Sequence, residues 1–473
     1  MTQNLPPLFL DQMKRQLGAG FDSFLEALDT PPPTSLRLNP GKPGAEFGDS
    51  SPVPWARDGL FLSERPAFFK DPLIYAGAYY VQEASSMLIA RAADFSRDLR
   101  ILDLCAAPGG KSTLLAAHMS SGSVLVSNEI VRNRAAILEE NISRWGHPNV
   151  LVTWNNPRDF AQLHHAFDLI VIDAPCSGEG MFRKDPKVVA HWSPRAVQEC
   201  AGRQKEILGH AMDALAPGGR LIYSTCTYNP TENEAVVQWL LDEFPGMFSL
   251  VPLGLPAEWG LSPGSVEGFS PDMRHACHCY PHRVRGEGFF MACLEKGNSG
   301  PAGGAPSANR EKQRGKHYHV RDKALLMPAT RKQRECLSEW LDQPGEFAYY
   351  LSGETAHAIP LRHESTLTGI AALLNPIKAG IKLGEFKRDM LVPGHDLAMS
   401  ERQSPRIPTA ELDLEQALRF LKRTELHQDH PGWMGWGVVK YKERNLGWIK
   451  ALQGRINNHF PKEMRIRSDL GLD

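Results

Sequence analysis

The stretch Leu99-Arg-Ile-Leu-Asp-Leu-Cys-Ala-Ala-Pro-Gly-Gly-Lys-Ser-Thr113 decides the fold class of this chain. It opens with an apolar run of strand length, and a glycine-rich turn separates that run from a helical pattern that begins near Ser112. Gly109 and Gly110 allow a ligand to approach the backbone closely where the helix begins. The stretch therefore predicts a strand, a ligand-binding loop and a helix in succession.

The same alternation of apolar runs and helical patterns continues through residues 97–296. Strands spaced by helices predict an α/β domain with a doubly wound parallel sheet that is covered on both faces. Such a sheet binds ligands beyond the carboxyl ends of its strands, so the residues after each run are candidate site residues. The further apolar runs lie at 123–127, 150–153, 167–172 and 220–224, with helical patterns at about 132–145 and 195–215.

Two classes of cofactor are compatible with the loop after the first strand. A phosphate-binding loop needs glycine where Cys105 stands, although Asp173 after an apolar strand is typical of the metal-binding Asp in such enzymes. S-adenosylmethionine is the other candidate, since Glu129 at the end of the second strand is positioned to bind ribose hydroxyls. An exposed glutamate that caps the following helix is the structural alternative for Glu129.

Two cysteines follow the ends of strands that we expect to be neighbours. Cys176 lies in Asp173–Gly180 and Cys226 lies in Ser224–Thr227, so we expect both thiols over one crevice. Paired thiols suit the methylation of a pyrimidine at carbon 5, because a thiolate must first add to carbon 6 to make carbon 5 nucleophilic. The second thiol would then assist the release of the methylated product.

Charged side chains near these thiols have two predicted tasks. Asp173 would bond N3 and the exocyclic amine of cytosine, and burial would have to keep its carboxyl neutral if it is to donate a proton to N3. Lys184, Arg183 or the sulfonium of the cofactor would lower the pKa of the attacking thiol.

Three long strings of residues resemble one enzyme family. They are Asp103–Lys111, Asp173–Gly180 followed by Arg183–Pro186, and Ser224–Glu234. They resemble the Sun-type RNA cytosine-5 methyltransferases, and among these the bacterial small-subunit ribosomal RNA methyltransferase F group. The resemblance implies a Rossmann-like class I methyltransferase core, S-adenosylmethionine as cofactor and 16S ribosomal RNA as substrate. A cytosine-5 methyltransferase that acts on tRNA or another RNA is the alternative within the family.

The resemblance also implies roles for individual residues. Cys226 would be the nucleophile and Cys176 the thiol that helps to release product, with reversed roles as the alternative. Asp173 would lie between cofactor and target base, and Glu129 would bind the ribose. Asn156 would contact the adenine where an aspartate is expected, with Asp159 as its substitute. The methionine part of the cofactor would lie against one loop, which consists of Cys105, Ala106, Ala107, Pro108, Gly109, Gly110 and Lys111.

The resemblance extends into both flanks of the core. Tryptophans between Trp433 and Trp448 alternate with Lys and Arg, as in proteins that stack on RNA, although Trp436 and Trp448 individually are expected to fill the core of a small barrel. The expected divisions are an N-terminal α+β region that faces RNA at 1–96, the methyltransferase core at 97–296, a Gly/Pro/Ser-rich and then basic linker at 297–320, an intermediate domain at 321–395, and a PUA-like β-rich RNA-binding domain at 396–473.

Composition and charge limit the class of protein. The net charge is −1 overall, but residues 301–473 carry about +6 and residues 1–300 about −7, which favours a polyanionic partner. No apolar run approaches the roughly 18 residues of a membrane span, and eight cysteines in 473 residues are too dilute for a disulfide scaffold. These limits predict a cytoplasmic protein with no membrane contact. Taken with the resemblance, they imply a monomer whose partner is RNA, 16S ribosomal RNA or the assembling small ribosomal subunit.

One cluster of potential zinc ligands, His275-Ala-Cys-His-Cys279 with His282, lacks a second ligand pair at a suitable distance. We therefore expect a strand there, and no metal. Two further functions remain as alternatives, a nucleotidase with a phosphate-binding loop and a ribosome-assembly factor that binds RNA without catalysis. Intact Cys226, Cys176 and Asp173 count against the second of these.

Overall fold

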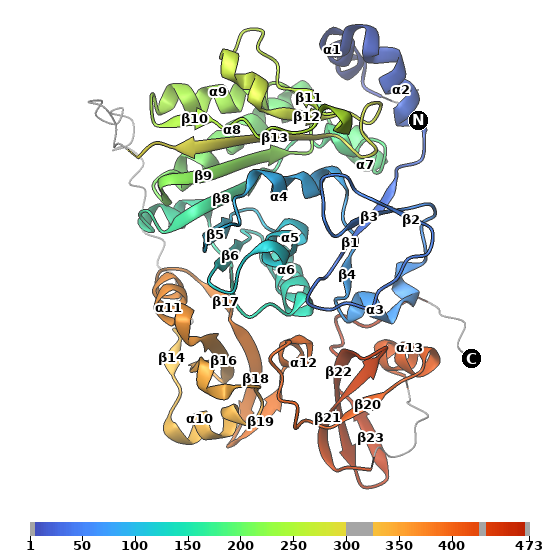
Figure 1. Ribbon diagram of the computed structural model, residues 1–473, viewed down its shortest axis with the longest axis vertical. Coiled ribbons are helices and arrows are strands. Elements are labelled where there is room, and N and C mark those ends of the chain that lie inside the picture. The colour runs from blue at the N-terminus through green and yellow to red at the C-terminus, as the bar shows by residue number, and fades with distance from the viewer. Residues whose placement is uncertain (1–4, 299–324, 425–431, 469–473) are drawn as a thin grey trace.

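A mixed sheet forms the centre of the computed structural model, which describes residues 5–298, 325–424 and 432–468 (Figure 1). Within those residues the sheet has ten strands, in the order β11-β12-β13-β9-β8-β5-β6-β7-β17, and β10 also pairs with β13. The strands at its centre run parallel, which confirms the predicted doubly wound α/β core. They are β5 (Arg100–Asp103), β6 (Val124–Asn128), β7 (Val150–Thr153), β8 (Phe167–Asp173) and β9 (Leu215–Thr225).

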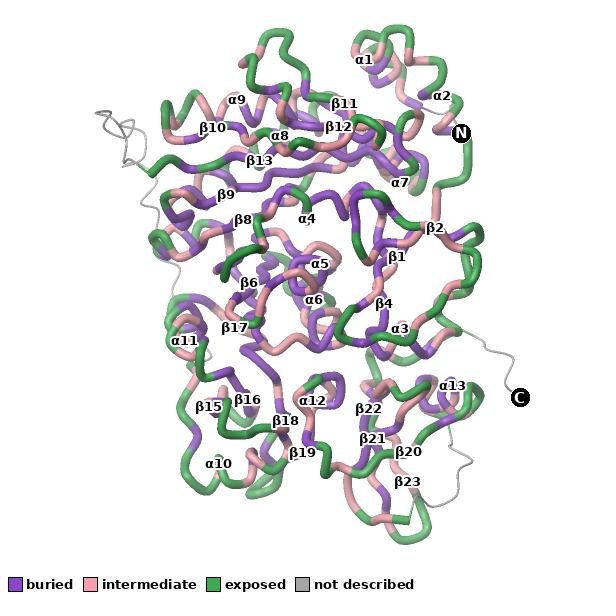
Figure 2. Tube along the Cα trace, in the orientation of Figure 1, coloured by how far each residue is buried: buried purple, intermediate pink, exposed green. Residues whose placement is uncertain are grey.

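Alternate side chains of the central strands enter two separate cores, one on each face of the sheet. Ile170 and Ile172 of β8 belong to one core, and Leu169 and Val171 belong to the other. These strands are therefore buried almost throughout (Figure 2). The first face is covered by α8 (Pro194–Ala211) and α9 (Glu234–Glu243), and the second by α5 (Gly110–His118) and α6 (Arg132–Trp145).

Antiparallel strands close both edges of this sheet. On one side β9 pairs with the last strand of the core, followed by shorter strands, and the strand predicted around Cys277 is among them. On the other side β17 (Pro376–Ala379), from far downstream in the chain, pairs with β7. The strands beyond β9 are β13 (Phe289–Lys296), β12 (Cys277–Cys279), β11 (Ser262–Pro263) and β10 (Phe248–Leu250).

The N-terminal region is fixed to the core through a buried arginine. Arg37 donates to Gln82 Oε1 at 3.0 Å and to Thr113 Oγ1 at 2.7 Å, and its guanidinium lies 4.4 Å from the ring centroid of Trp145. Two N-terminal helices pack against Phe182 and Tyr228, which follow the strand ends of the core. The elements are α1 (Pro7–Leu17), α2 (Phe21–Asp29), α3 (Pro72–Tyr75) and a sheet of β2 (Ser50–Pro52), β3 (Gly59–Leu62), β1 (Thr34–Leu38) and β4 (Tyr79–Tyr80).

Two further sheets lie in the C-terminal part of the chain, below the core in Figure 1. Trp448 is buried and its indole donates to the Gly394 carbonyl at 2.8 Å, so this tryptophan fills a core. Trp436 is half-buried beneath the Lys450 ammonium at 5.2 Å. One sheet consists of β14 (Met327–Pro328), β15 (Phe347–Ser352), β16 (Thr355–Pro360), β18 (Ile381–Lys387) and β19 (Met390–Pro393), with α10 (Arg331–Ser338), α11 (Glu364–Leu373) and α12 (His395–Met399) beside it. The other consists of β20 (Thr409–Glu411), β21 (Gly435–Tyr441), β22 (Arg444–Leu452) and β23 (Arg455–Asn458), with α13 (Leu414–Lys422).

Most of the predicted linker and its basic continuation, residues 299–324, lies outside the described residues. In the parts of the chain that are described, no helix combines the length and the apolar character needed to cross a bilayer.

A buried ion pair joins β17, β18 and α12. Lys378 Nζ donates to Asp396 and to the Gly380 carbonyl, and Asp396 also accepts a hydrogen bond from the Lys382 backbone N–H at 2.6 Å. The two charged side chains are 1% and 7% exposed. Because neither charge reaches water, each depends on the other.

Asp396→Ala is expected to destabilise the protein by about 3–5 kcal/mol, since it leaves the Lys378 ammonium buried and unpaired. The midpoint of urea unfolding, followed by tryptophan fluorescence, measures the effect. Asp389→Ala is the matched control, because it removes an exposed Lys–Asp pair at 2.9 Å in the turn between β18 and β19, and its midpoint should stay at the wild-type value. Equal midpoints for both variants would contradict the prediction.

Candidate active site

The register of two neighbouring strands brings the two cysteines together. In the parallel pairing of β8 with β9, Asp173 lies opposite Ser224. Cys176 follows Asp173 by three residues and Cys226 follows Ser224 by two, so their side chains emerge at the same edge of the sheet. The two Sγ atoms lie 3.3 Å apart, and both thiols are free and half-buried.

The environment of the two thiols favours Cys176 as the hydrogen-bond donor and Cys226 as the acceptor. The bond to Cys226 and burial together raise the pKa of Cys176 well above its ordinary value. Cys176 therefore keeps its proton near neutral pH and can donate it toward Cys226 Sγ.

Lys111 is paired with Asp173. It belongs to the loop at 105–111, which is called the cofactor loop below because the sequence predicts that it binds the cofactor. Lys111 Nζ lies 2.6 Å from Asp173 Oδ2, and Ser224 Oγ donates to the other carboxylate oxygen at 2.8 Å. Burial acts to lower the pKa of Lys111, but the Asp173 carboxylate and its hydrogen bond outweigh burial, so the pKa is raised. Asp173 is thus the anionic partner of a lysine and its side chain is 30% exposed, in contrast to the neutral, buried carboxyl that proton donation would require.

The loop from Cys105 to Lys111 lies directly beyond β5, as the sequence predicts. Gly109 has φ +113°, a conformation that favours glycine, and α5 begins at the next residue. Asp103, at the end of β5, accepts a hydrogen bond from Ser112 Oγ at 2.6 Å, while its Oδ1 atom is buried with no partner among the described residues. Burial raises the pKa of Asp103 to about 7. The sequence analysis did not select Asp103 as a site residue, although it is a charged residue at the end of the first predicted strand.

Glu129 is buried at the end of β6 and is bound on both oxygens. It accepts a hydrogen bond from the Val131 backbone N–H at 2.9 Å, and Arg134 Nη1 lies 3.3 Å from its Oε2 atom. Arg134 also donates to the Ala107 carbonyl at 2.8 Å, so it connects Glu129 to the cofactor loop. An exposed glutamate was the structural alternative for Glu129 in the sequence analysis. The structure differs from it, since Glu129 is only 3% exposed.

The other predicted site residues have structural partners. Asn156 and Asp159 form a capping box: Asn156 Oδ1 accepts from the Arg158 N–H, and Asp159 Oδ2 accepts from the Asn156 N–H. Lys184 Nζ lies 3.6 Å from Glu287 Oε1, so its charge faces a buried carboxylate.

Two buried glutamates, which the sequence analysis did not select, hold the cysteine loops together. Glu232 accepts from the Ser177 N–H at 2.8 Å and from Gln204 Nε2 at 3.1 Å. Glu179 accepts from Asn229 Nδ2 at 2.9 Å. These carboxylates therefore join the loop after β8 to the loop after β9. The available sequence signal was their place in the strings Asp173–Gly180 and Ser224–Glu234, which carry the family resemblance.

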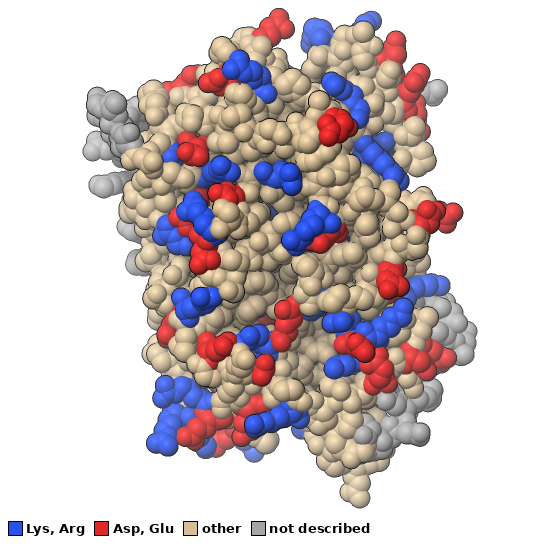
Figure 3. Space-filling view, in the orientation of Figure 1, with Lys and Arg blue, Asp and Glu red and all other residues tan. Residues whose placement is uncertain are grey.

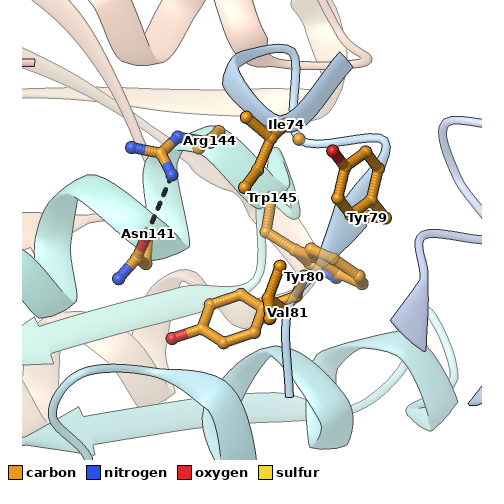
Figure 4. A pocket seen from close by; sticks show the side chains of 8 residues that line it. Ile74, Tyr79, Tyr80, Val81, Asn141, Arg144 and Trp145 are labelled. Carbon is orange, nitrogen blue, oxygen red and sulfur yellow. Dashed lines mark hydrogen bonds between the residues drawn. The ribbon is translucent and has the colours of Figure 1, made fainter. Parts of the chain in front are cut away.

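A cavity of about 200 Å³ lies behind the cofactor loop (Figure 4). Figure 4 shows Asn141 and Arg144 of α6 bonded to each other on one side, with Tyr79, Tyr80 and Trp145 on the other. Asn141 Nδ2 also donates to the Pro108 carbonyl at 2.7 Å, so the side of α6 that lines this cavity also holds the loop at 105–111. Within the described residues no group of three or more His, Cys, Asp or Glu side chains is arranged to hold a metal ion, and His278 instead bonds Glu234 at 2.7 Å.

Comparison with known proteins assigns the family. Three family models match the chain: "16S rRNA methyltransferase RsmB/F" over residues 91–295, "N-terminal domain of 16S rRNA methyltransferase RsmF" over 5–84, and "Methyltransferase RsmF PUA domain" over 408–466. The ribosomal RNA small subunit methyltransferase F of Escherichia coli O139:H28 is 32% identical over 98% of this chain and 97% of its own length. The chain belongs to the ribosomal RNA small subunit methyltransferase F family.

Other members of this methyltransferase F family and one solved structure agree. The protein of that name from Salmonella typhi is 34% identical over 97% of this chain and 96% of its own length. A crystal structure of a methyltransferase homolog from Pyrococcus horikoshii aligns with a TM-score of 0.51 and 31% identity, over 62% of this chain and 100% of that chain. The methyltransferase F family consists of S-adenosylmethionine-dependent ribosomal RNA methyltransferases, so the predicted methyltransferase core and PUA domain are confirmed.

Proposed function

We propose that this protein transfers a methyl group from S-adenosylmethionine to carbon 5 of a cytosine in 16S ribosomal RNA, through a covalent bond between Cys226 and carbon 6. The observation that carries the proposal is the contact of two free thiols at 3.3 Å, beside the Lys111–Asp173 pair, at the carboxyl edge of the sheet. A binding protein without catalysis has no need for this arrangement.

Cys226 is the nucleophile in this proposal. Its thiolate adds to carbon 6, and the electron pair of the 5,6 double bond becomes available at carbon 5 for the methyl group. Two neighbours are placed to stabilise the attacking sulfur in this step: the Cys176 thiol, 3.3 Å from Cys226 Sγ, and the Lys111 ammonium, which is paired with Asp173. We assign this electrostatic task to Lys111 in place of Lys184, because Lys184 faces Glu287.

Asp173 and Cys176 act before and after the methyl transfer. The Asp173 carboxylate accepts from the exocyclic amine of the cytosine, and the paired Lys111 ammonium supplies positive charge as negative charge develops on the ring. After transfer the carbon 5 proton passes to a water molecule, the electron pair of that C–H bond re-forms the 5,6 double bond, and the bond between carbon 6 and Cys226 Sγ breaks with its electron pair on sulfur. Cys176, within hydrogen-bond distance of that sulfur, assists its release.

The residues around the loop fit S-adenosylmethionine, which supplies a methyl group on a sulfonium when it is bound. The unpartnered Asp103 Oδ1 suits the ammonium of its methionine part, which would lie against Cys105, Ala106, Ala107, Pro108, Gly109, Gly110 and Lys111. Glu129 would hold the ribose. We choose Asn156 for the adenine, because its amide nitrogen takes no part in the capping box, whereas Asp159 Oδ2 accepts two hydrogen bonds.

A phosphate-binding role for the same loop is less well supported. Such a loop needs its lysine free to reach phosphate oxygens, whereas Lys111 is engaged by Asp173 at 2.6 Å. We also propose that the chain acts as a monomer, since one chain carries both thiols and the cofactor loop, and that residues 1–96 and 396–473 hold RNA on either side of the core.

The modified base tests the function directly. Bisulfite sequencing of 16S ribosomal RNA should show 5-methylcytosine in cells with the wild-type protein and its loss, at one or more positions, in cells without the gene. Cys226→Ala should fail to restore it. An unchanged 5-methylcytosine pattern in the cells without the gene would overturn the proposal.

The two thiols should differ in covalent trapping. Cys176→Ala is expected to accumulate a protein–RNA adduct that resists denaturing electrophoresis, with turnover lowered about 100-fold or more because release is impaired. Cys226→Ala should form no adduct. The wild-type protein should form one with RNA that contains 5-fluorocytidine, and an adduct that requires Cys176 but not Cys226 would mean that the roles are exchanged.

Binding of the cofactor should weaken in acid. The pKa of Asp103, raised from 3.8 to about 7, makes its carboxyl neutral below that pH, and the attraction for the cofactor ammonium is then lost. The Kd for S-adenosylmethionine, measured by calorimetry, should rise about tenfold from about pH 8 to about pH 6. Asp103→Asn should bind weakly with no such pH dependence; a retained dependence would assign it to another group.

A further inference from the structure

A cleft of about 430 Å³ lies between the N-terminal region and the core. One wall is the extended segment Thr30–Thr34, which connects α2 to β1 on the right in Figure 1. The opposite wall is formed by Pro281, Val284, Arg285 and Gly286, and the lining is completed by Leu62, Ser63, Arg65 and Arg183. The three consecutive prolines 31–33 fix the backbone of the first wall, so the cleft is preformed.

The lining of this cleft carries three arginines and, among the described residues, no carboxylate. One of them, Arg183, is buried and neutralised, since its guanidinium binds Glu287 at 3.0 and 3.1 Å. Arg65 and Arg285 are exposed and have no ion pair within the described part of the chain. The cleft therefore presents two uncompensated positive charges.

Both of these arginines are held in place by aromatic rings. The Arg285 guanidinium lies 4.5 Å from the ring centroid of Phe61, and Arg285 Nη1 donates to Ser51 Oγ at 3.1 Å. The Arg65 guanidinium lies 5.5 Å from the ring centroid of Phe68. Stacking on a ring orients a guanidinium while its remaining N–H donors stay available, which is the geometry that binds a phosphate.

The cleft is connected to the thiols through directly packed backbone. Gly286 lines the cleft, and two residues later Gly288 packs so closely on Gly180 that neither position has room for a side chain. The Gly180 N–H donates to the Cys226 carbonyl at 2.9 Å. Two short backbone contacts thus separate the cleft from Cys226, which is the basis for placing in the cleft the nucleotides next to a base at Cys226.

We infer that this cleft binds the phosphodiester backbone of the RNA next to the target cytosine, with Arg65 and Arg285 as the phosphate contacts. The inference rests on the proposed function, because it takes the RNA to be the substrate at Cys226. Net charge alone does not mark such a path, since Lys and Arg are interspersed with Asp and Glu over the face in Figure 3. Unpaired charge in a preformed cleft distinguishes this site from that background.

The test combines binding and turnover in the full-length protein. For Arg65→Gln with Arg285→Gln, the Kd and KM for 16S ribosomal RNA should rise about tenfold, and the slope of log Kd against log salt should fall by about 0.7 for each lost contact. The kcat and the Kd for S-adenosylmethionine should stay at wild-type values. Arg65→Lys with Arg285→Lys should restore part of the affinity, since the charge is kept but the two-pronged hydrogen bonding is lost.

Arg195→Gln is the matched control, because Arg195 is also exposed but is paired with Glu199 at 2.7 Å on α8. Its RNA affinity and salt slope should equal those of the wild type. Unchanged RNA binding in the double glutamine variant would overturn the inference. So would a loss of affinity for the assembled small subunit but not for naked RNA, since the cleft would then contact protein. Wild-type protein that binds RNA through the cleft but makes no 5-methylcytosine would overturn only the proposed function.

Discussion

The pairing of β8 with β9 is the constraint on which the rest of the site depends. Both strands are buried on their two faces, and a shift of register by one residue would move every side chain from the core that it fits into the core on the opposite face. The register that packing selects sets Asp173 opposite Ser224 and leads the two following loops into the same space. The contact of the Cys176 and Cys226 sulfurs thus follows from main-chain pairing in the interior, and the cofactor loop adds Lys111 from the adjacent strand β5.

Buried polar groups keep the loops beyond those strands in one conformation. Glu232 and Glu179 tie the two cysteine loops to each other, and Arg183 binds Glu287 near the last strand of the core. A buried polar group that loses its partner destabilises the fold. Separation of the loops would therefore carry a large unfavourable free energy. This rigidity would matter for the reaction that we propose, in which the Cys226 sulfur forms a bond and the Cys176 sulfur stays close to it.

Strand positions and strand ends could be predicted from the sequence, because apolar runs and glycine turns report local structure. This holds for the loop at 105–111 and for the convergence of Cys176, Cys226 and Asp173. Contacts between distant segments carry no such local signal. Periodicity at Tyr79–Ala93 predicts a helix, but Tyr79 and Tyr80 pair with β1 as a strand and helical turns begin only at Ser85. Likewise the engagement of Lys111 by Asp173, and of Lys184 by Glu287, depends on distances that spacing alone does not fix.

Strand β17 has a consequence for how the protein matures. In the described part of the chain, the edge of the central sheet at β7 is covered by β17, residues 376–379, which are synthesised long after β7 itself. During translation that edge therefore presents unpaired backbone groups until the C-terminal third emerges from the ribosome. A nascent chain that stalls before this point has its thiols and its loop but an open sheet edge, so completion of the central sheet is tied to synthesis of the C-terminal third.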